Sequence, residues 1–150
     1  MLLLDDRTGR GTRMSAHEMT KMGDFDLRER MDRDVGEVLV GRARWLLAGD
    51  RELIEFYFGQ GIAAVEIARL QGKPVRSVRR RLKRLATRLA SEPFAGVLRQ
   101  REAWPKRRRN VATAVIVEGK TLGNAAKTLG LTLHQIRREM AVIEHLVGRQ

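Results

Sequence analysis

Residues 61–89, GIAAVEIARLQGKPVRSVRRRLKRLATRL, are matched in pattern by residues 119–147, GKTLGNAAKTLGLTLHQIRREMAVIEHLV. The matching residues lie 58 positions apart in each case: Gly61 and Gly119, Ala68 and Ala126, Gly72 and Gly130, Val78 and Ile136, and Leu82 and Met140. One offset shared by all these pairs predicts two copies of a single structural unit.

The shared residue types suit two helices joined by a tight turn. A small residue (Ala68, Ala126) lets two helices cross closely, and the glycine four positions later can adopt the left-handed conformation that the turn needs. A branched residue six positions beyond the glycine packs the second helix against the first. The pattern therefore predicts a helix-turn-helix in each copy.

Apolar residues elsewhere recur every three or four positions, which predicts helices, and no segment alternates with the period of a strand. We expect an all-α protein with tandem helix-turn-helix units and an additional N-terminal helix. The predicted helices cover residues 26–46, 50–58, 64–70, 75–89, 106–118, 122–129 and 133–147. We expect Gly49 to end the first helix, Asp50 to cap the second, and Thr132 with Gln135 to form a capping box for the last.

The predicted organisation has four parts. Residues 1–24 show no periodicity and are expected to form a flexible leader. Residues 25–90 hold the N-terminal helix and the first helix-turn-helix, residues 91–105 a connector, and residues 106–150 the second unit. Four aromatic side chains at helical spacing are interpreted as packing residues: Trp45, Phe56, Phe94 and Trp104.

The chain is strongly basic. Its 150 residues carry a formal net charge of +12, and residues 51–100 hold 11 basic and 4 acidic side chains, residues 101–150 hold 10 and 4, and residues 1–50 hold 9 and 10. Such a cationic excess favours a polyanionic partner, because binding releases counterions from phosphates. We therefore expect the last two-thirds of the chain to bind nucleic acid.

The sequence has no cysteine, which excludes disulfide scaffolds, thiol catalysis and cysteine-ligated zinc, and which fits a reducing cytosol. The apolar start at residues 2–4 is too short for a signal peptide, and no later stretch could span a bilayer. We expect a cytoplasmic protein that does not bind membranes.

No catalytic or cofactor-binding pattern is evident. Residues 119–121 (GKT) resemble the end of a phosphate-binding loop, but Ala114 stands where the earlier glycine is required and no strand is predicted before it. The isolated histidines His17 and His145 are expected at the surface. We expect a protein that is not an enzyme and that binds no cofactor or metal.

The first unit resembles region 4 of sigma-70 factors over residues 46–90. The resemblance rests on residues 50–61 (DRELIEFYFGQG), 65–68 (VEIA) and 75–85 (VRSVRRRLKRL). It implies that the last helix enters the major groove of the promoter −35 element and that the domain docks on the β flap of RNA polymerase. The positions that match the DNA-reading helix are Arg76, Ser77, Arg79, Arg80 and Lys83.

The chain departs from that family in identifiable places. Leu70-Gln71-Gly72 sets the leucine one residue earlier than usual, and Lys73-Pro74 replaces the common start of the reading helix. No aromatic, basic promoter-melting region precedes residue 46. We therefore expect neither a complete sigma factor nor promoter opening by this chain alone.

The helix predicted over residues 75–89 carries six cations within nine positions: Arg76, Arg79, Arg80, Arg81, Lys83 and Arg84. Cations so close together repel one another unless anions lie nearby, so we predict contacts with DNA rather than a solvated face. Residues near the helix start are expected at base edges and later cations at phosphates. The predicted site in this unit comprises Arg76, Ser77, Arg79, Arg80, Lys83 and Arg84.

Two further groups complete the predicted DNA-binding site. The corresponding positions of the second unit hold His134, Gln135, Arg137 and Arg138, of which Gln135 suits adenine and the arginines suit guanine or the backbone. A structural or protein-binding role is the alternative there, because Glu139 and Glu144 dilute the charge. Lys106, Arg107 and Arg108 stand at a predicted helix start, where they oppose the helix dipole unless an outside anion holds them; a solvated linker is the alternative.

These features favour a transcription regulator that reads adjacent major-groove segments of double-stranded DNA with two helix-turn-helix units. The N-terminal helix would brace the first unit or make a homodimer contact. One alternative is a sigma-like adaptor whose main partner is RNA polymerase or another regulator. Another is a DNA-binding accessory of a mobile-element recombinase.

Overall fold

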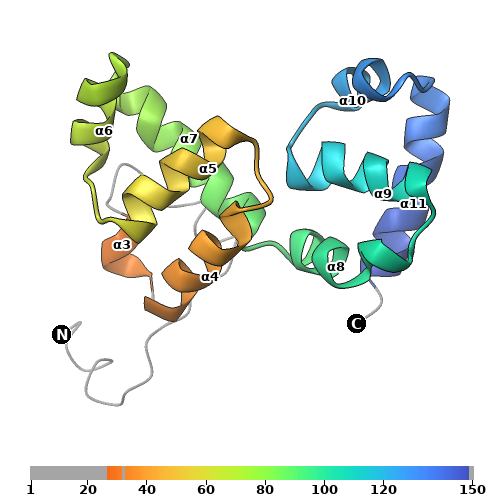
Figure 1. The fold of residues 1–150 in the computed structure, drawn as a ribbon, viewed down its shortest axis with the longest axis horizontal. Helices are drawn as coiled ribbons and strands as arrows, with labels where there is room; N and C mark the ends of the chain where they lie inside the picture. The colour runs from red at the N-terminus through yellow and green to blue at the C-terminus, as the bar shows by residue number, and fades with distance from the viewer. Residues whose placement is uncertain (1–26, 32, 149–150) are drawn as a thin grey trace. The chain divides into compact units, whose positions relative to one another are not determined.

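The structure, a computed structural model, describes residues 27–31 and 33–148. Throughout these ranges the regular secondary structure is helical (Figure 1), which confirms the predicted all-α class. The leader predicted over residues 1–24, with His17, lies outside the described residues.

Contacts within the chain divide it into two compact units. Of the described residues, 27–31, 33–44 and 48–87 belong to the first unit, and 45–47 and 88–148 belong to the second. The short segment 45–47 thus packs with residues that follow it much later in the sequence.

The first unit starts with the one-turn helix α3 (Leu27–Arg30) and α4 (Arg33–Ala43). α5 (Ala48–Ile54) continues as a π-helical turn (Glu55–Gly59), and α6 (Ala64–Gln71) and α7 (Val75–Leu89) follow. α4 packs against α5 and the π-helical turn. The fully buried side chains of this unit include Leu39, Leu53, Ile54, Ile67 and Leu82.

The second unit contains α8 (Glu92–Gln100), a 3₁₀ turn (Arg101–Ala103) and α9 (Lys106–Ala112). A π-helical turn (Thr113–Val117), α10 (Leu122–Leu129) and α11 (Leu133–Val147) follow. α11 packs against α8, α9 and α10. The fully buried side chains of this unit include Phe94, Val97, Val111, Ile136 and Ile143.

The repeat extends over whole elements. α5 and α9, the two π-helical turns, α6 and α10, and α7 and α11 all begin and end 58 residues apart. Hydrogen bonds repeat as well: the Gln60 N–H donates to the Glu55 carbonyl at 2.8 Å, and the Glu118 N–H donates to the Thr113 carbonyl at 2.8 Å. Both units are therefore copies of one helical arrangement.

Left-handed glycines define the same turns in both units. Their φ angles are 73° at Gly61 and Gly119, 63° at Gly72 and 64° at Gly130. Gly72 ends α6, and the Lys73 N–H then donates to the Ala68 carbonyl at 2.9 Å. Because glycine alone adopts this conformation without strain, the helix ends predicted at Gly72 and Gly130 are confirmed.

The prediction of a single helix over residues 26–46 is wrong. The chain forms α3 and α4 instead, α4 ends at Ala43, and Gly49 lies inside α5 rather than ending a helix. Tyr57 contacts α3: its hydroxyl accepts a hydrogen bond from the Leu27 N–H at 3.1 Å, and its ring centroid lies 4.2 Å from the Arg28 guanidinium. Helical periodicity carries no signal of such tertiary contacts.

The segment predicted as a connector forms α8 instead. Ser91 caps this helix by accepting a hydrogen bond from the Phe94 N–H at 3.3 Å, and Pro93 lies in the first turn. Proline interrupts a helix interior but fits a first turn, where its missing N–H is not needed. Phe94 and Val97 are 0% exposed, so α8 contributes to the core.

The packing role predicted for the aromatic residues is confirmed for Phe94 and for Trp104, which is 9% exposed. Phe56 is half-buried. Trp45 is 37% exposed, and the guanidinium of the buried Arg101 lies 4.0 Å from its ring centroid. Trp45 is therefore a surface residue stacked on a cation rather than a core residue.

Replacing Gly96 should destabilise the second unit. A Cβ at this position would lie 2.8 Å from the Val147 Cβ of α11, and overpacking of this kind costs about 1–3 kcal/mol. Gly123 is the matched control, because a Cβ there would meet no atom within 4 Å and alanine favours a helix by up to about 1 kcal/mol. Urea unfolding of Gly96→Ala and Gly123→Ala should give opposite signs; equal shifts would contradict the close α8–α11 contact.

Candidate nucleic-acid interface

α7 has one apolar and one cationic face. Val78, Leu82, Leu85 and Leu89 are at most 3% exposed. On the other faces the predicted site residues Arg76, Ser77, Arg79, Arg80 and Arg84 are exposed, and Lys83 is half-buried. α7 therefore presents these polar side chains while its apolar face fills the core.

Four of these cations have no partner in the described part of the chain. There, Arg76, Arg79, Arg80 and Arg84 make no side-chain hydrogen bond or ion pair. Arg76 and Arg80 lie four residues apart, as do Arg80 and Arg84, and like charges at this spacing destabilise a helix by about 0.2–0.5 kcal/mol per pair. An anion beside these arginines would relieve this repulsion.

Arg81 differs from its neighbours because it contacts α5. Its Nε and Nη2 donate to Asp50 Oδ1 at 2.9 and 2.5 Å, and the two side chains are 33% and 16% exposed. The N-cap role predicted for Asp50 is wrong, because α5 already begins at Ala48. Asp50 instead joins α5 to α7.

The corresponding face of α11 carries fewer cations than that of α7. His134, Arg137 and Arg138 are exposed, and Gln135 is half-buried. The predicted capping box is confirmed: the Gln135 N–H donates to Thr132 Oγ1 at 3.1 Å, and the Thr132 N–H donates to Gln135 Oε1 at 2.9 Å. Capping uses one lone pair of Gln135 Oε1, so the side-chain NH₂ group and the second lone pair are what it can offer a ligand.

The basic run at the start of α9 divides into two groups. Lys106 and Arg107 are exposed. Arg108 instead donates from Nε to Glu139 Oε2 at 3.0 Å, with the side chains 25% and 20% exposed. Arg108 thereby joins α9 to α11, and the candidate anion-binding residues of this run are Lys106 and Arg107.

The two interhelical ion pairs occupy equivalent positions with reversed charge. Asp50 corresponds to Arg108 and Arg81 to Glu139, each 58 positions apart. In the first unit the acid lies on the earlier helix and the base on the later one; the second unit has the opposite arrangement. Sequence reasoning missed both pairs, although the repeat offset already aligned opposite charges at both positions.

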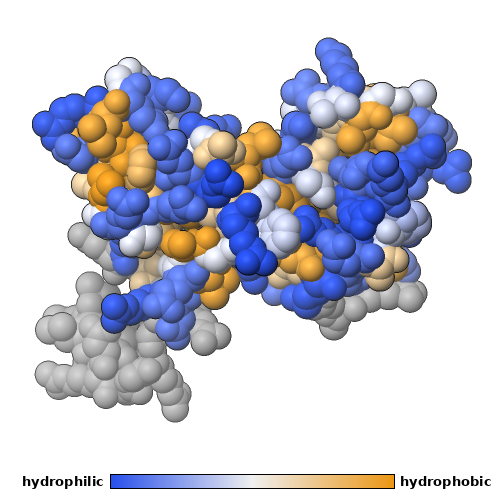
Figure 2. All heavy atoms as spheres, in the orientation of Figure 1, coloured by the Kyte–Doolittle hydropathy of each residue, from blue (hydrophilic) through white to orange (hydrophobic). Residues whose placement is uncertain are grey.

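α6 exposes apolar side chains that its counterpart lacks. Val65 and Leu70 are 55% and 68% exposed, and Figure 2 shows hydrophobic surface at the position of α6. The equivalent positions of α10 are Gly123 and Thr128. Large apolar residues at these positions are therefore not required by the repeated fold.

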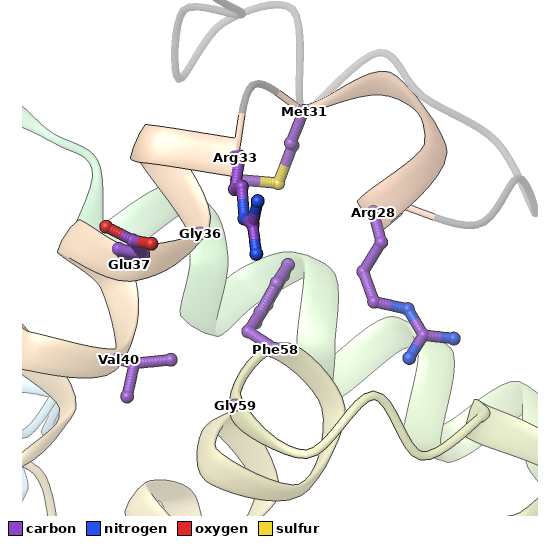
Figure 3. A pocket seen from close by; sticks show the side chains of 8 residues that line it. All are labelled: Arg28, Met31, Arg33, Gly36, Glu37, Val40, Phe58 and Gly59. Carbon is purple, nitrogen blue, oxygen red and sulfur yellow. The ribbon is translucent and has the colours of Figure 1, made fainter.

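An open cavity of about 570 Å³ lies between α3, α4 and the first π-helical turn. Phe58 points toward Met31 and Arg33, while Arg28 lies on one side and Glu37 on the other (Figure 3). The residues that line the cavity include apolar side chains, two arginines and one carboxylate, which belongs to Glu37. This arrangement brings no acid–base pair together.

No group of three or more histidine, cysteine, aspartate or glutamate side chains in residues 27–31 and 33–148 could hold a metal ion. No helix in the same ranges has the length and hydropathy needed to cross a membrane.

Comparison with known proteins finds no family model, curated protein or solved structure that matches this chain. The resemblance of residues 46–90 to sigma-70 region 4 therefore stays a prediction from sequence.

Arg107 and Arg108, which are adjacent in α9, should differ in their effect on stability. Arg108→Ala should lower the free energy of unfolding by about 1–2 kcal/mol, because Glu139 would lose its partner in a partly buried position. Arg107→Ala should change it by less than about 0.5 kcal/mol. Both variants lose one positive charge, so equal unfolding curves would contradict the structural role of Arg108.

Proposed function

We propose that this chain is a transcription regulator that binds duplex DNA by inserting α7 and α11 into the major groove. α7 supplies the stronger contact, and α11 supplies a second contact of the same geometry within its own unit.

The exposed cationic face of α7 is the observation that carries this proposal. Arg76, Arg79 and Arg80 lie in the first half of a helix whose opposite face is buried. A helix of this kind fits the major groove, where arginine pairs with O6 and N7 of guanine and later cations reach phosphates. Phosphate also relieves the repulsion between the arginines.

The elements before the reading helices support the same function. α6 ends at the left-handed Gly72 and α7 begins at Val75, which is the order of a helix-turn-helix. α10, Gly130 and α11 repeat this order. The region that resembles sigma-70 region 4, residues 46–90, contains the first of these pairs.

One observation favours a second candidate function, an adaptor that binds RNA polymerase or another regulator. Val65 and Leu70 of α6 are exposed although the fold does not need them there. Exposed apolar side chains of this size can form the centre of a protein interface. In this case DNA binding would be secondary.

Selection of duplexes from a random pool, followed by affinity measurements at two salt concentrations, tests the proposal. The wild type should enrich a motif. Arg76→Ala/Arg79→Ala/Arg80→Ala should lose that motif and bind the selected duplex about 100-fold more weakly, since a good arginine–guanine contact contributes about 1–3 kcal/mol.

The matched control removes the same charge elsewhere. Arg33, Arg51 and Arg99 are exposed and lie outside α6, α7, α10 and α11, so their triple alanine variant should bind within about threefold of wild type. Equal losses in both triple variants would contradict readout by α7. Full DNA binding by the α7 variant, with RNA polymerase binding lost in Val65→Ser/Leu70→Ser, would establish the adaptor instead.

A further inference from the structure

The two proposed reading helices can be compared position by position. α7 and α11 are both 15 residues long, and each begins three residues after a left-handed glycine. Residues 58 positions apart therefore project from equivalent places in their own units. Shared side chains should make shared contacts, and different side chains should make different ones.

The shared part consists of two arginines in each helix. Arg79 and Arg80 of α7 correspond to Arg137 and Arg138 of α11, and all four are exposed. The same guanidinium groups at the same register recognise the same feature of duplex DNA, which is guanine or phosphate.

The first turn of each helix differs. Arg76 and Ser77 of α7 are replaced by His134 and Gln135 in α11. Arg76 can donate two hydrogen bonds to one guanine, whereas Gln135 offers its NH₂ group and the one lone pair of Oε1 that the helix cap leaves unused. The residues closest to base edges thus have different preferences in the two units.

The later turns also differ. Lys83 and Arg84 of α7 correspond to Ala141 and Val142 of α11. Cations at this depth along a reading helix lie near phosphates. α7 therefore offers cations for backbone contacts at positions where α11 has none.

We propose that the DNA target consists of two non-identical half-sites, one for each unit. The half-sites share the element recognised by the common arginine pairs and differ at the base pairs that face the first helical turns. Of the two reading helices, α7 contributes more of the salt-dependent affinity than α11, because Lys83 and Arg84 have no cationic counterpart in α11. This inference rests on the proposed function.

Conversion of one reading helix into the other tests the inference. Arg76→His/Ser77→Gln gives the first turn of α7 the side chains of α11, so the first half-site selected from a random duplex pool should change toward the second. Lys83→Ala/Arg84→Ala should reduce the slope of log K against log salt by about 2, since each phosphate contact contributes about 0.9. The control Ala141→Ser/Val142→Ser should leave that slope unchanged.

Each outcome has one meaning. A changed first half-site with a reduced salt slope supports the inference. An unchanged motif in Arg76→His/Ser77→Gln overturns it, as does a single half-site that is insensitive to Arg137→Ala/Arg138→Ala; in both cases the proposed function survives. Failure of the wild type to select or bind any duplex overturns the proposed function as well.

A second inference rests on the reversed ion pairs and is independent of DNA. If α11 replaced α7 beside α5, Asp50 would face Glu139, and if α7 replaced α11 beside α9, Arg81 would face Arg108. Like charges in these partly buried positions oppose such packing. We infer that the reversed charges prevent α7 and α11 from exchanging places. This holds both within one chain and between two copies of the chain.

Refolding of two charge variants tests this pairing role. Arg108→Asp/Glu139→Arg keeps an ion pair in the second unit but gives both units the same polarity, so monomer recovery from urea at high protein concentration should fall at least threefold as exchanged dimers form. Adding Asp50→Arg/Arg81→Glu reverses the first unit too and should restore recovery. Equal recovery of wild type and the first variant overturns the inference, and equally poor recovery of both variants overturns it by showing a local defect in the second unit.

Discussion

Both units depend on a backbone constraint at the glycine that separates the last two helices. The left-handed conformation of Gly72 and Gly130 ends one helix and redirects the chain within three residues, so that the following helix starts in a fixed register. That register puts Val78 and Ile136 into their cores, 3% and 0% exposed. The same register decides which side chains face outward, and the candidate DNA-binding face is therefore a consequence of the turn.

Arginine has two distinct roles in this chain. Arg81 and Arg108 are partly buried and neutralised by carboxylates, so they join helices. Arg76, Arg79 and Arg80 are exposed and make no ion pair with another described residue. A high net charge alone does not distinguish these roles, because a partner across 31 residues of sequence is visible only after folding.

The two units share a fold but differ in their surfaces. Buried positions that lie 58 residues apart are apolar in both units. Leu39 corresponds to Val97, and Leu53 corresponds to Val111. Surface positions have changed: α6 exposes Leu70 where α10 has Thr128, and α7 ends its cationic face with Arg84 where α11 has Val142. Packing constrains the buried positions, whereas exposed positions can change with the partner. This asymmetry fits the proposal that the two units bind unequal half-sites.

The sequence by itself determined the helical class, the repeat, the bounds of α7, α10 and α11, and the capping box at Thr132, because short-range periodicity, glycine turns and caps are local effects. It also indicated the exposed arginines, which are Arg76, Arg79, Arg80 and Arg84 on α7 and Arg137 and Arg138 on α11. Tertiary structure decided the rest: Tyr57 contacts α3, Phe94 of α8 lies in the core, Asp50 pairs with Arg81 instead of capping a helix, and Arg108 pairs with Glu139 instead of offering an anion site. These features depend on contacts between residues far apart in sequence, to which local spacing is blind.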